Sequence, residues 1–286
     1  MRTSLAGLFV AARLLFASVV ASAVGVPAAY VKPETLDGWR LYVEAVEQRR
    51  AGELSDPSRF LALDYVAPDE RRVVSSGRIV TAALRARNPR SEAIPVPGAE
   101  VHHWRGAVFI PGVTVAEVMA TLQEAPPKQA DVLQARVLAR GADSMKVYLR
   151  LRRSKIVTVI YDTEHDVRFW RYGNDRAASA TIATGIAELD DVGTAAERRL
   201  PAGEDHGFLW RLNAYWRYSA VPGGVIAECE SLTLSRGVPF GLRTIARPII
   251  DSTARESMTS ALEAVRDAAT RHKTPGLPTN RGDPVS

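Results

Sequence analysis

The chain has 286 residues, of which 46% are hydrophobic, and its formal net charge at neutral pH is +5. This length allows a full hydrophobic core, and we expect one large domain between trimmed ends. Arginines are mixed with acids throughout, which is typical of a solvated surface and speaks against nucleic acid as a partner. A single cysteine, Cys229, excludes an intrachain disulfide, and within a strand it is expected to be a small buried hydrophobe.

The first 23 residues resemble a secretory signal peptide. Arg2 and Arg13 accompany the apolar run 14–20, and Ala21-Ser22-Ala23 has the small-residue pattern of a cleavage site. An uncleaved membrane anchor is the alternative, but Arg13 leaves the apolar run short of the roughly 20 residues that a span needs. We therefore expect cleavage after Ala23 and an extracytoplasmic product, periplasmic or secreted.

Residues 24–56 are expected to form a separate segment with a brace helix. From Pro33 onward, apolar side chains recur at helical spacing, and Gly52 is the expected stop. These side chains are Trp39, Tyr42, Val43 and Val46. The main domain is expected to span residues 57–273, beginning with a loop over 56–71.

Two strands and a short helix come next in the prediction. Val73 to Arg85 alternates like a strand, and a second strand is expected from Val101 to Ile110. Thr114 with Glu117 three residues later forms a capping box that predicts a short helix. Pro126 and Pro127 end that helix.

A run of strands without intervening helices follows, as an antiparallel meander requires. Short turns rich in Gly and Asp separate most of its members. The predicted strands are Val132–Arg140, Met145–Arg153, Ile156–Tyr172, Ala178–Leu189, Phe208–Tyr218 and Val225–Leu234, with a polar loop over 190–205.

The last predicted element is a long helix from Leu242 to Arg271. Met258, Leu262 and Val265 lie on one of its faces, and Pro248 is expected to kink or restart it. Residues 274–286 are rich in Pro and Gly without an apolar face, which predicts a disordered tail.

The hairpin around Pro222-Gly223-Gly224 has two distinct faces. Strict alternation places Phe208, Trp210, Trp216 and Tyr218 on one side of its first strand. Arg211, Asn213 and Arg217 then lie on the other side, where Glu228 and Glu230 of the second strand can pair with them. This charged side is expected to be an outer surface, with a polar anchor inside a cavity as the alternative.

The order of elements and four phrases resemble the START-like, polyketide-cyclase and pollen-allergen helix-grip (SRPBCC) superfamily, in a secreted, uncharacterised bacterial branch. The resemblance covers about Val73 to Arg271, and the phrases are His102–Thr114, Thr163–Val167, His206–Arg217 and Glu228–Arg236. Where members of the branch carry Asp-Tyr and further aromatic residues after the short helix, this chain has Gln123–Ala130.

The resemblance implies an α+β helix-grip fold. We expect a curved antiparallel sheet of about seven or eight strands wrapped around the long C-terminal helix, with the brace helix as an addition. It also implies an apolar cavity between sheet and final helix, which members use to hold lipids, sterols or polyketides. Many members are binders, and a minority are cyclases or hydrolases.

Ten side chains are candidates for contact with a ligand in such a cavity, since small-molecule sites are mostly apolar with a few polar groups. Ordinary core packing would use the same aromatic residues. The candidates are His102, Trp104, Tyr148, Tyr161, Trp170, Trp210, Arg211, Trp216, Glu228 and Met258.

Neither a catalytic set nor a metal site is indicated. His102 and His103 are adjacent on a strand and point to opposite faces, and no His or Cys pair has the spacing that metal ligands need. Glu164-His165-Asp166 is expected to be an exposed cluster at the turn side rather than a catalytic dyad.

Three functions remain open, and we expect a monomer without cofactor. The first is a binding protein for a hydrophobic small molecule, with transient membrane contact left open. The second is a cofactor-free cyclase, dehydratase or hydrolase with His102, Tyr148, Tyr161, Arg211 or Glu228 as acid–base candidates. The third is a structural envelope protein with a filled interior.

Overall fold

The computed structural model describes residues 30–154, 158–237 and 243–272. The predicted signal peptide and the predicted tail lie outside these ranges, as do the first two residues of the predicted strand 156–172 and Leu242 of the predicted last helix.

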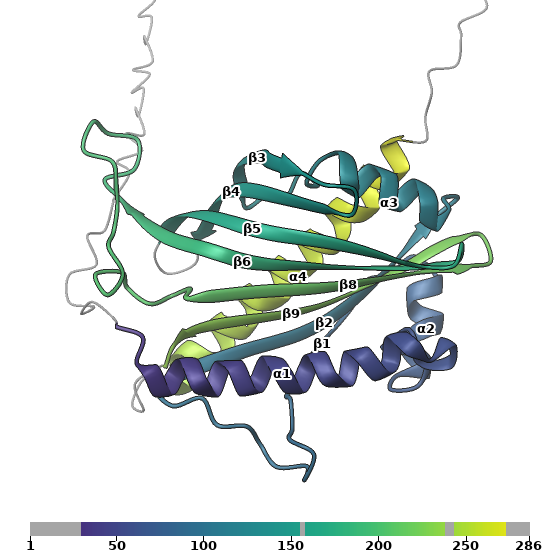
Figure 1. Ribbon diagram of the computed structural model, residues 1–286, viewed down its shortest axis with the longest axis horizontal. Helices are drawn as coiled ribbons and strands as arrows, with labels where there is room; N and C mark the ends of the chain where they lie inside the picture. The colour runs from purple at the N-terminus through teal and green to yellow at the C-terminus, as the bar shows by residue number, and fades with distance from the viewer. Residues whose placement is uncertain (1–29, 155–157, 238–242, 273–286) are drawn as a thin grey trace, which may run out of the picture.

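Within these ranges, one antiparallel sheet of nine strands organises the structure (Figure 1). The strand order is β1-β2-β9-β8-β6-β5-β4-β3, and the short strand β7 pairs with β6. The strands are β1 (Val80–Ala83), β2 (Ala99–Pro111), β3 (Val132–Arg140), β4 (Ser144–Ser154), β5 (Thr158–Tyr172), β6 (Arg176–Asp190), β7 (Arg198–Arg199), β8 (Arg211–Val221) and β9 (Gly224–Arg236). The predicted meander is confirmed.

Two long helices lie on opposite sides of this sheet (Figure 1). The helices are α1 (Pro33–Ser55), α2 (Pro68–Ser75), α3 (Val115–Glu124) and α4 (Arg243–His272), with two 3-10 turns, η1 (Pro57–Arg59) and η2 (Ala62–Asp64). Helix α4 runs through Pro248 without interruption. The predicted α+β helix-grip architecture, with an additional N-terminal helix, is confirmed.

The side of the sheet that packs against α4 is called the α4 face. Helix α4 lies chiefly on β2, where Trp104 joins Met258 and Leu262 in the largest buried cluster. A methyl group at Gly106 would lie 2.7 Å from Leu262 and 2.8 Å from Met258. Glycine at this position therefore lets the helix approach the strand closely.

The opposite side, the α1 face, is covered by the brace helix. Trp39, Tyr42 and Val46 form one buried stripe on α1 and pack against Leu232 and Leu234 of β9. The predicted additional helix at the N-terminal side is confirmed. It extends three residues beyond Gly52, to Ser55.

The segment between α1 and β1 differs from its prediction. The expected strand over 73–85 is confirmed only for 80–83, which form β1 and pair with β2; its first part is wrong, because residues 68–75 form α2. Pro68 lies in the first turn of α2, followed by Asp69 and Glu70, and this combination favours a helix start over a strand. The 3-10 turns and α2 then cover the end of the sheet beside α1 with apolar side chains, which are Phe60, Leu61, Leu63 and Val74.

Local signals elsewhere predicted the elements well. Thr114 and Glu117 form the expected capping box at the start of α3. The predicted hairpin turn joins β8 to β9, with Gly223 at a φ of +83°. A Cβ on Gly224 would lie 2.1 Å from the carbonyl oxygen of Ile110, so the backbone contact there requires glycine.

None of the helices in the described ranges combines the length and the apolar composition that crossing a membrane requires.

Candidate functional site

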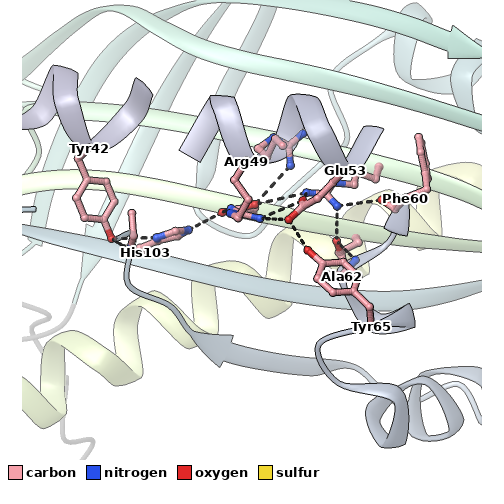
Figure 2. A network of polar contacts seen from close by, with 12 residues as sticks. Tyr42, Arg49, Glu53, Phe60, Ala62, Tyr65 and His103 are labelled. Carbon is pink, nitrogen blue, oxygen red and sulfur yellow. Dashed lines mark hydrogen bonds and ion pairs between the residues drawn. The ribbon is translucent and has the colours of Figure 1, made fainter. Parts of the chain in front are cut away.

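A network of buried charges lies between α1 and the sheet (Figure 2). Helix α1 contributes Arg49, Arg50 and Glu53, and the 3-10 segments contribute backbone groups and Tyr65. The sheet contributes His103 from β2, Arg217 from β8, and Glu228 and Glu230 from β9. These groups come from segments far apart in the sequence, so the network forms only when α1 is docked.

Arg217 lies at the centre of this network and is 1% exposed. Its guanidinium donates to Glu53 and to the Phe60 carbonyl, the latter over 2.9 Å. The carboxylates of Glu228 and Glu230 lie 3.7 and 3.8 Å away. One arginine on the sheet thus faces three glutamates, and the charged side of the hairpin is not the outer surface that alternation alone suggested. The reason is that α1 covers it.

Glu228 ties the 3-10 segment to the sheet. Its two carboxylate oxygens accept hydrogen bonds from the backbone N–H groups of Ala62 and Leu63, at 3.0 and 3.1 Å. Burial raises the pKa of Glu228, while Arg217 and the two backbone donors oppose that rise. Glu228 therefore acts as an acceptor that satisfies buried backbone groups.

Glu230 is held as an anion by several donors. His103 donates to it through Nε2 at 2.6 Å, and Arg49 and Arg50 pair with it. Burial alone would raise the pKa of Glu230, but the hydrogen bond from His103 and the nearby cations lower it to about 2. The carboxylate is thus charged throughout the neutral range.

His103 has a defined tautomer in this arrangement. The hydroxyl of Tyr42 accepts from the backbone N–H of Ala86 at 2.8 Å, so its own proton points to His103 Nδ1 at 3.0 Å. The imidazole then carries its proton on Nε2 and donates it to Glu230. Figure 2 shows Tyr42 and His103 side by side at its left, joined by the hydrogen bond between them.

Glu53 closes the network from the helix side. It accepts from Arg49, Tyr65 and Arg217. Burial opposes its ionisation, yet Arg217, Tyr65 and Arg49 hold the pKa of Glu53 below its ordinary value. All three glutamates have hydrogen-bond or ion-pair partners from at least two segments of the chain. We call this network of Glu53, Glu228, Glu230, Arg217 and their partners the clamp, since it ties α1 and the 3-10 segment to the sheet.

A pocket of about 340 Å³ opens beside the clamp, between α1, η1 and the chain that follows β1. Its inner wall carries Glu53, His103, Arg105 and Glu230, and Arg49 reaches into it from α1. This pocket is on the α1 face, whereas the cavity predicted from the sequence lies between the sheet and α4.

Five of the ten predicted ligand residues lie on the α1 face. Tyr148 bonds to Asp162, which Arg150 also binds at 2.8 Å. Trp170 lies on β5 and is 44% exposed, and Arg211 donates to the carbonyl oxygen of Trp210. The structure does not bring these five residues together with the others; they are Tyr148, Trp170, Trp210, Arg211 and Glu228.

The predicted alternation of side chains is wrong at Trp210. This residue precedes β8, which begins at Arg211, and it packs with Trp39 and Tyr42 of α1 instead of sharing a face with Trp216. Its Nε1 donates to Asp205 at 3.1 Å, and this bond in the preceding loop turns the indole away from the strand pattern. Phe208 lies in the same loop and stacks on His206 with ring centroids 5.9 Å apart.

The other five predicted residues lie on the α4 face. Trp104 and Met258 are in its buried cluster, and Trp216 packs against that cluster and stacks on Tyr218. His102 faces the same way and bonds to Ser235 at 3.0 Å. The fifth residue is Tyr161 on β5, opposite Leu151 of β4.

Sequence reasoning missed His165 as a residue of this face. Cross-strand pairing sets His165 beside Val147, whose side chain belongs to the α4-face cluster. The expectation of an exposed cluster at the turn side is wrong for His165, which is 1% exposed, because β5 is long and central enough to bury its middle. The regular alternation of Thr163, His165 and Val167 was the available signal.

Two polar atoms on the α4 face lack a hydrogen-bond partner among the described residues: the hydroxyl of Tyr161 and Nδ1 of His165. Thr163 donates to the Leu149 carbonyl, so it accepts from His165 Nε2 at 2.8 Å. Burial lowers the pKa of His165 to about 4 and raises that of Tyr161. At neutral pH the face therefore offers a free acceptor nitrogen and a free hydroxyl.

Comparison with known proteins gives matches among solved structures only: no family model matches the chain, and no curated protein matches it in sequence. A STAR-related lipid transfer protein fragment from Xanthomonas axonopodis is 16% identical, with a TM-score of 0.42, covering 66% of this chain and 98% of that one. The Zhui aromatase/cyclase of Streptomyces sp. R1128 is 12% identical, with a TM-score of 0.37 and coverages of 60% and 95%.

Human StAR-related lipid transfer protein 5 is 13% identical to the chain, with a TM-score of 0.36, covering 73% of this chain and 94% of that one. Two of these three proteins are lipid transfer proteins and one is an aromatase/cyclase. Identities this low leave the function to be inferred from the chain's own residues.

Proposed function

We propose that the chain is a binding protein for an elongated, mainly apolar small molecule, which it holds between the α4 face of the sheet and α4. The observation that carries this proposal is the pair of buried polar atoms without a partner, Tyr161 Oη and His165 Nδ1. An unpaired buried polar group costs about 1–3 kcal/mol, and a ligand that pairs with it removes that cost. The surrounding apolar side chains supply the remaining contact surface.

The positions of the two residues restrict the ligand. Tyr161 and His165 lie four residues apart on one strand, which corresponds to roughly 13 Å between their backbone positions along β5. We therefore propose that separate polar groups of the ligand contact the two side chains. The ligand that fits has two polar groups, such as hydroxyl or carbonyl groups, on an apolar frame of the size of a sterol or a polyketide.

A cofactor-free enzyme is less well supported. The free Nδ1 of neutral His165 could accept a proton, but the acid–base candidates expected from the sequence do not converge on it. His102 and Tyr161 share the α4 face, whereas Tyr148, Arg211 and Glu228 lie on the α1 face. Three of the five are therefore separated from His165 by the sheet.

Native mass spectrometry of the purified protein, with solvent extraction, tests whether a ligand is bound. The variant Tyr161→Phe tests whether that ligand contacts the proposed site. The free hydroxyl has no described partner, so Tyr161→Phe should leave the stability of the ligand-free protein unchanged or slightly higher. Affinity for the extracted molecule, or for cholesterol or palmitate as probes, should fall by about 2- to 10-fold.

The matched control for this experiment is Tyr218→Phe. Tyr218 is buried on the same face, but its hydroxyl shares a hydrogen bond with Ser179. This change should therefore cost about 0.5–1.5 kcal/mol of stability without lowering the affinity for the ligand. The proposal fails if nothing co-purifies and neither probe binds. Turnover of the bound molecule would favour the enzyme instead.

We also propose that the chain acts outside the cytoplasm, on the support of the leader and its Ala21-Ser22-Ala23 pattern. When the full chain is expressed in a Gram-negative bacterium, the periplasmic fraction should contain a product that begins at Val24. Amino-terminal sequencing and intact mass measure this directly. Full-length protein confined to the cytoplasm would contradict it.

A further inference from the structure

The pocket on the α1 face is built from five segments of the chain. Helix α1, the 3-10 region, the chain after β1 and strands β2 and β9 all contribute side chains to its volume of about 340 Å³. This volume is at the lower end of the range for small-molecule sites. The sheet separates it from the α4 face, so it is a different site from the one proposed above.

The charge of the pocket is strongly positive. Five arginines line it against two glutamates, Glu53 and Glu230, and the arginines are Arg49, Arg59, Arg85, Arg87 and Arg105. Glu53 and Glu230 are already paired with Arg49 and with groups of the clamp. Arg59 stacks on Tyr65 and lies near enough to Asp56 to attract its carboxylate, and Arg87 donates to the Ser91 carbonyl. Arg85 is exposed. Within the described ranges none of these three arginines forms an ion pair with a carboxylate of the pocket lining. The rim therefore carries unbalanced positive charge.

Arg105 brings this charge to the inner wall. Its side chain is buried, and among the described residues its hydrogen-bond partner is Glu70, which Nη2 reaches at 3.1 Å. Its other guanidinium nitrogens have no further hydrogen-bond partner among the described residues, and Arg105 is part of the pocket lining. A planar guanidinium with free donors matches the geometry of carboxylate and phosphate oxygens.

Apart from Tyr65 and His103, the remaining lining is apolar: Ala45, Ala62, Val66, Leu84 and Ala86. We propose that this pocket binds a small amphipathic oxyanion, a carboxylate or phosphate with a short alkyl chain. Arg105 and the rim arginines Arg59, Arg85 and Arg87 hold the oxyanion, and the alkyl chain packs on the apolar lining.

Isothermal titration calorimetry with octyl phosphate and octanoate tests this proposal, with octanol as the neutral probe. Both anions should bind at one site and octanol should not, and raising the salt concentration should weaken the anions because the rim arginines are exposed. Equal binding of octanol, or no binding of either anion, would overturn the proposal.

Three variants make the test specific to the pocket. Arg85→Gln removes an exposed, unpaired rim charge and should weaken octyl phosphate by about 2- to 5-fold. Arg105→Lys keeps the charge opposite Glu70 but loses the planar fork, and should weaken it about tenfold. Arg168→Gln removes an exposed arginine on β5 outside the pocket and should have no effect. If Arg85→Gln and Arg168→Gln weaken octyl phosphate binding equally, the binding depends on the net charge of the protein and not on the pocket, which would overturn the proposal.

Vesicles distinguish the source of the anion. If vesicles of phosphatidylcholine with phosphatidic acid bind the wild type but not Arg85→Gln, the oxyanion is a lipid headgroup. If only the binding of octyl phosphate depends on Arg85, the oxyanion belongs to a free amphiphile. Tyr161→Phe separates the two sites of this protein. Weaker octyl phosphate binding in Tyr161→Phe would assign the probe to the α4 face, which overturns this inference and supports the proposed function.

Discussion

Replacing Arg217 with methionine is expected to destabilise the protein by about 3–5 kcal/mol, because three buried glutamates then lose the cation between them. For a chain of this size the melting temperature should fall by roughly 6–20 °C. Methionine has a similar length and no charge, so the effect reports the loss of the guanidinium more than the loss of volume. Urea unfolding and thermal melts at pH 7 measure it.

Arg211→Met is the matched control for that change. Arg211 lies on the same face of the same strand, but it is only partly buried and its guanidinium donates to the carbonyl oxygen of Trp210. The expected cost is at most about 1 kcal/mol. Equal melting temperatures for the two variants would show that the clamp contributes nothing to the docking of α1.

The sequence predicted the pairing in the clamp but not its burial. Alternation along β8 and β9 correctly places Arg217 beside Glu228 on one face. Which element covers that face depends on α1, more than 150 positions earlier in the chain, and no local pattern connects the two. Long-range packing of this kind leaves no periodic signal on the strands themselves.

A signal was nevertheless present on α1. Trp39, Tyr42 and Val46 define a buried stripe, and Arg50 and Glu53 continue it at the same helical spacing. Charges that continue an apolar stripe are a reason to look for buried partners. The run Glu47–Arg50 looks solvent-exposed only when its composition is considered without the helix period.

The candidate ligand residues divided between the two faces for a related reason. Where a strand is continuous, as in β5 or β9, alternation assigns faces correctly. Where the chain enters a strand from a loop, the assignment fails, as for Trp210. His165 was missed for the opposite reason, since its acidic neighbours suggested a turn although it lies inside β5.

Trp210→Ala is expected to lower the free energy of unfolding by about 3–5 kcal/mol. The indole is buried against Trp39 and Tyr42 of α1, and its loss also removes the Nε1–H donor from Asp205. Urea unfolding followed by circular dichroism measures the change.

Trp170→Ala is the control for this last prediction, since Trp170 lies on the same side of the sheet with 44% of its surface exposed and should cost no more than about 0.5 kcal/mol. Equal costs would contradict the docking role of Trp210. Because Trp210 belongs to the α1 face, folded Trp210→Ala should still bind the ligand of the α4 face with wild-type affinity. Loss of that affinity without loss of stability would show that Trp210 contacts the ligand, which would contradict its assignment to the α1 face.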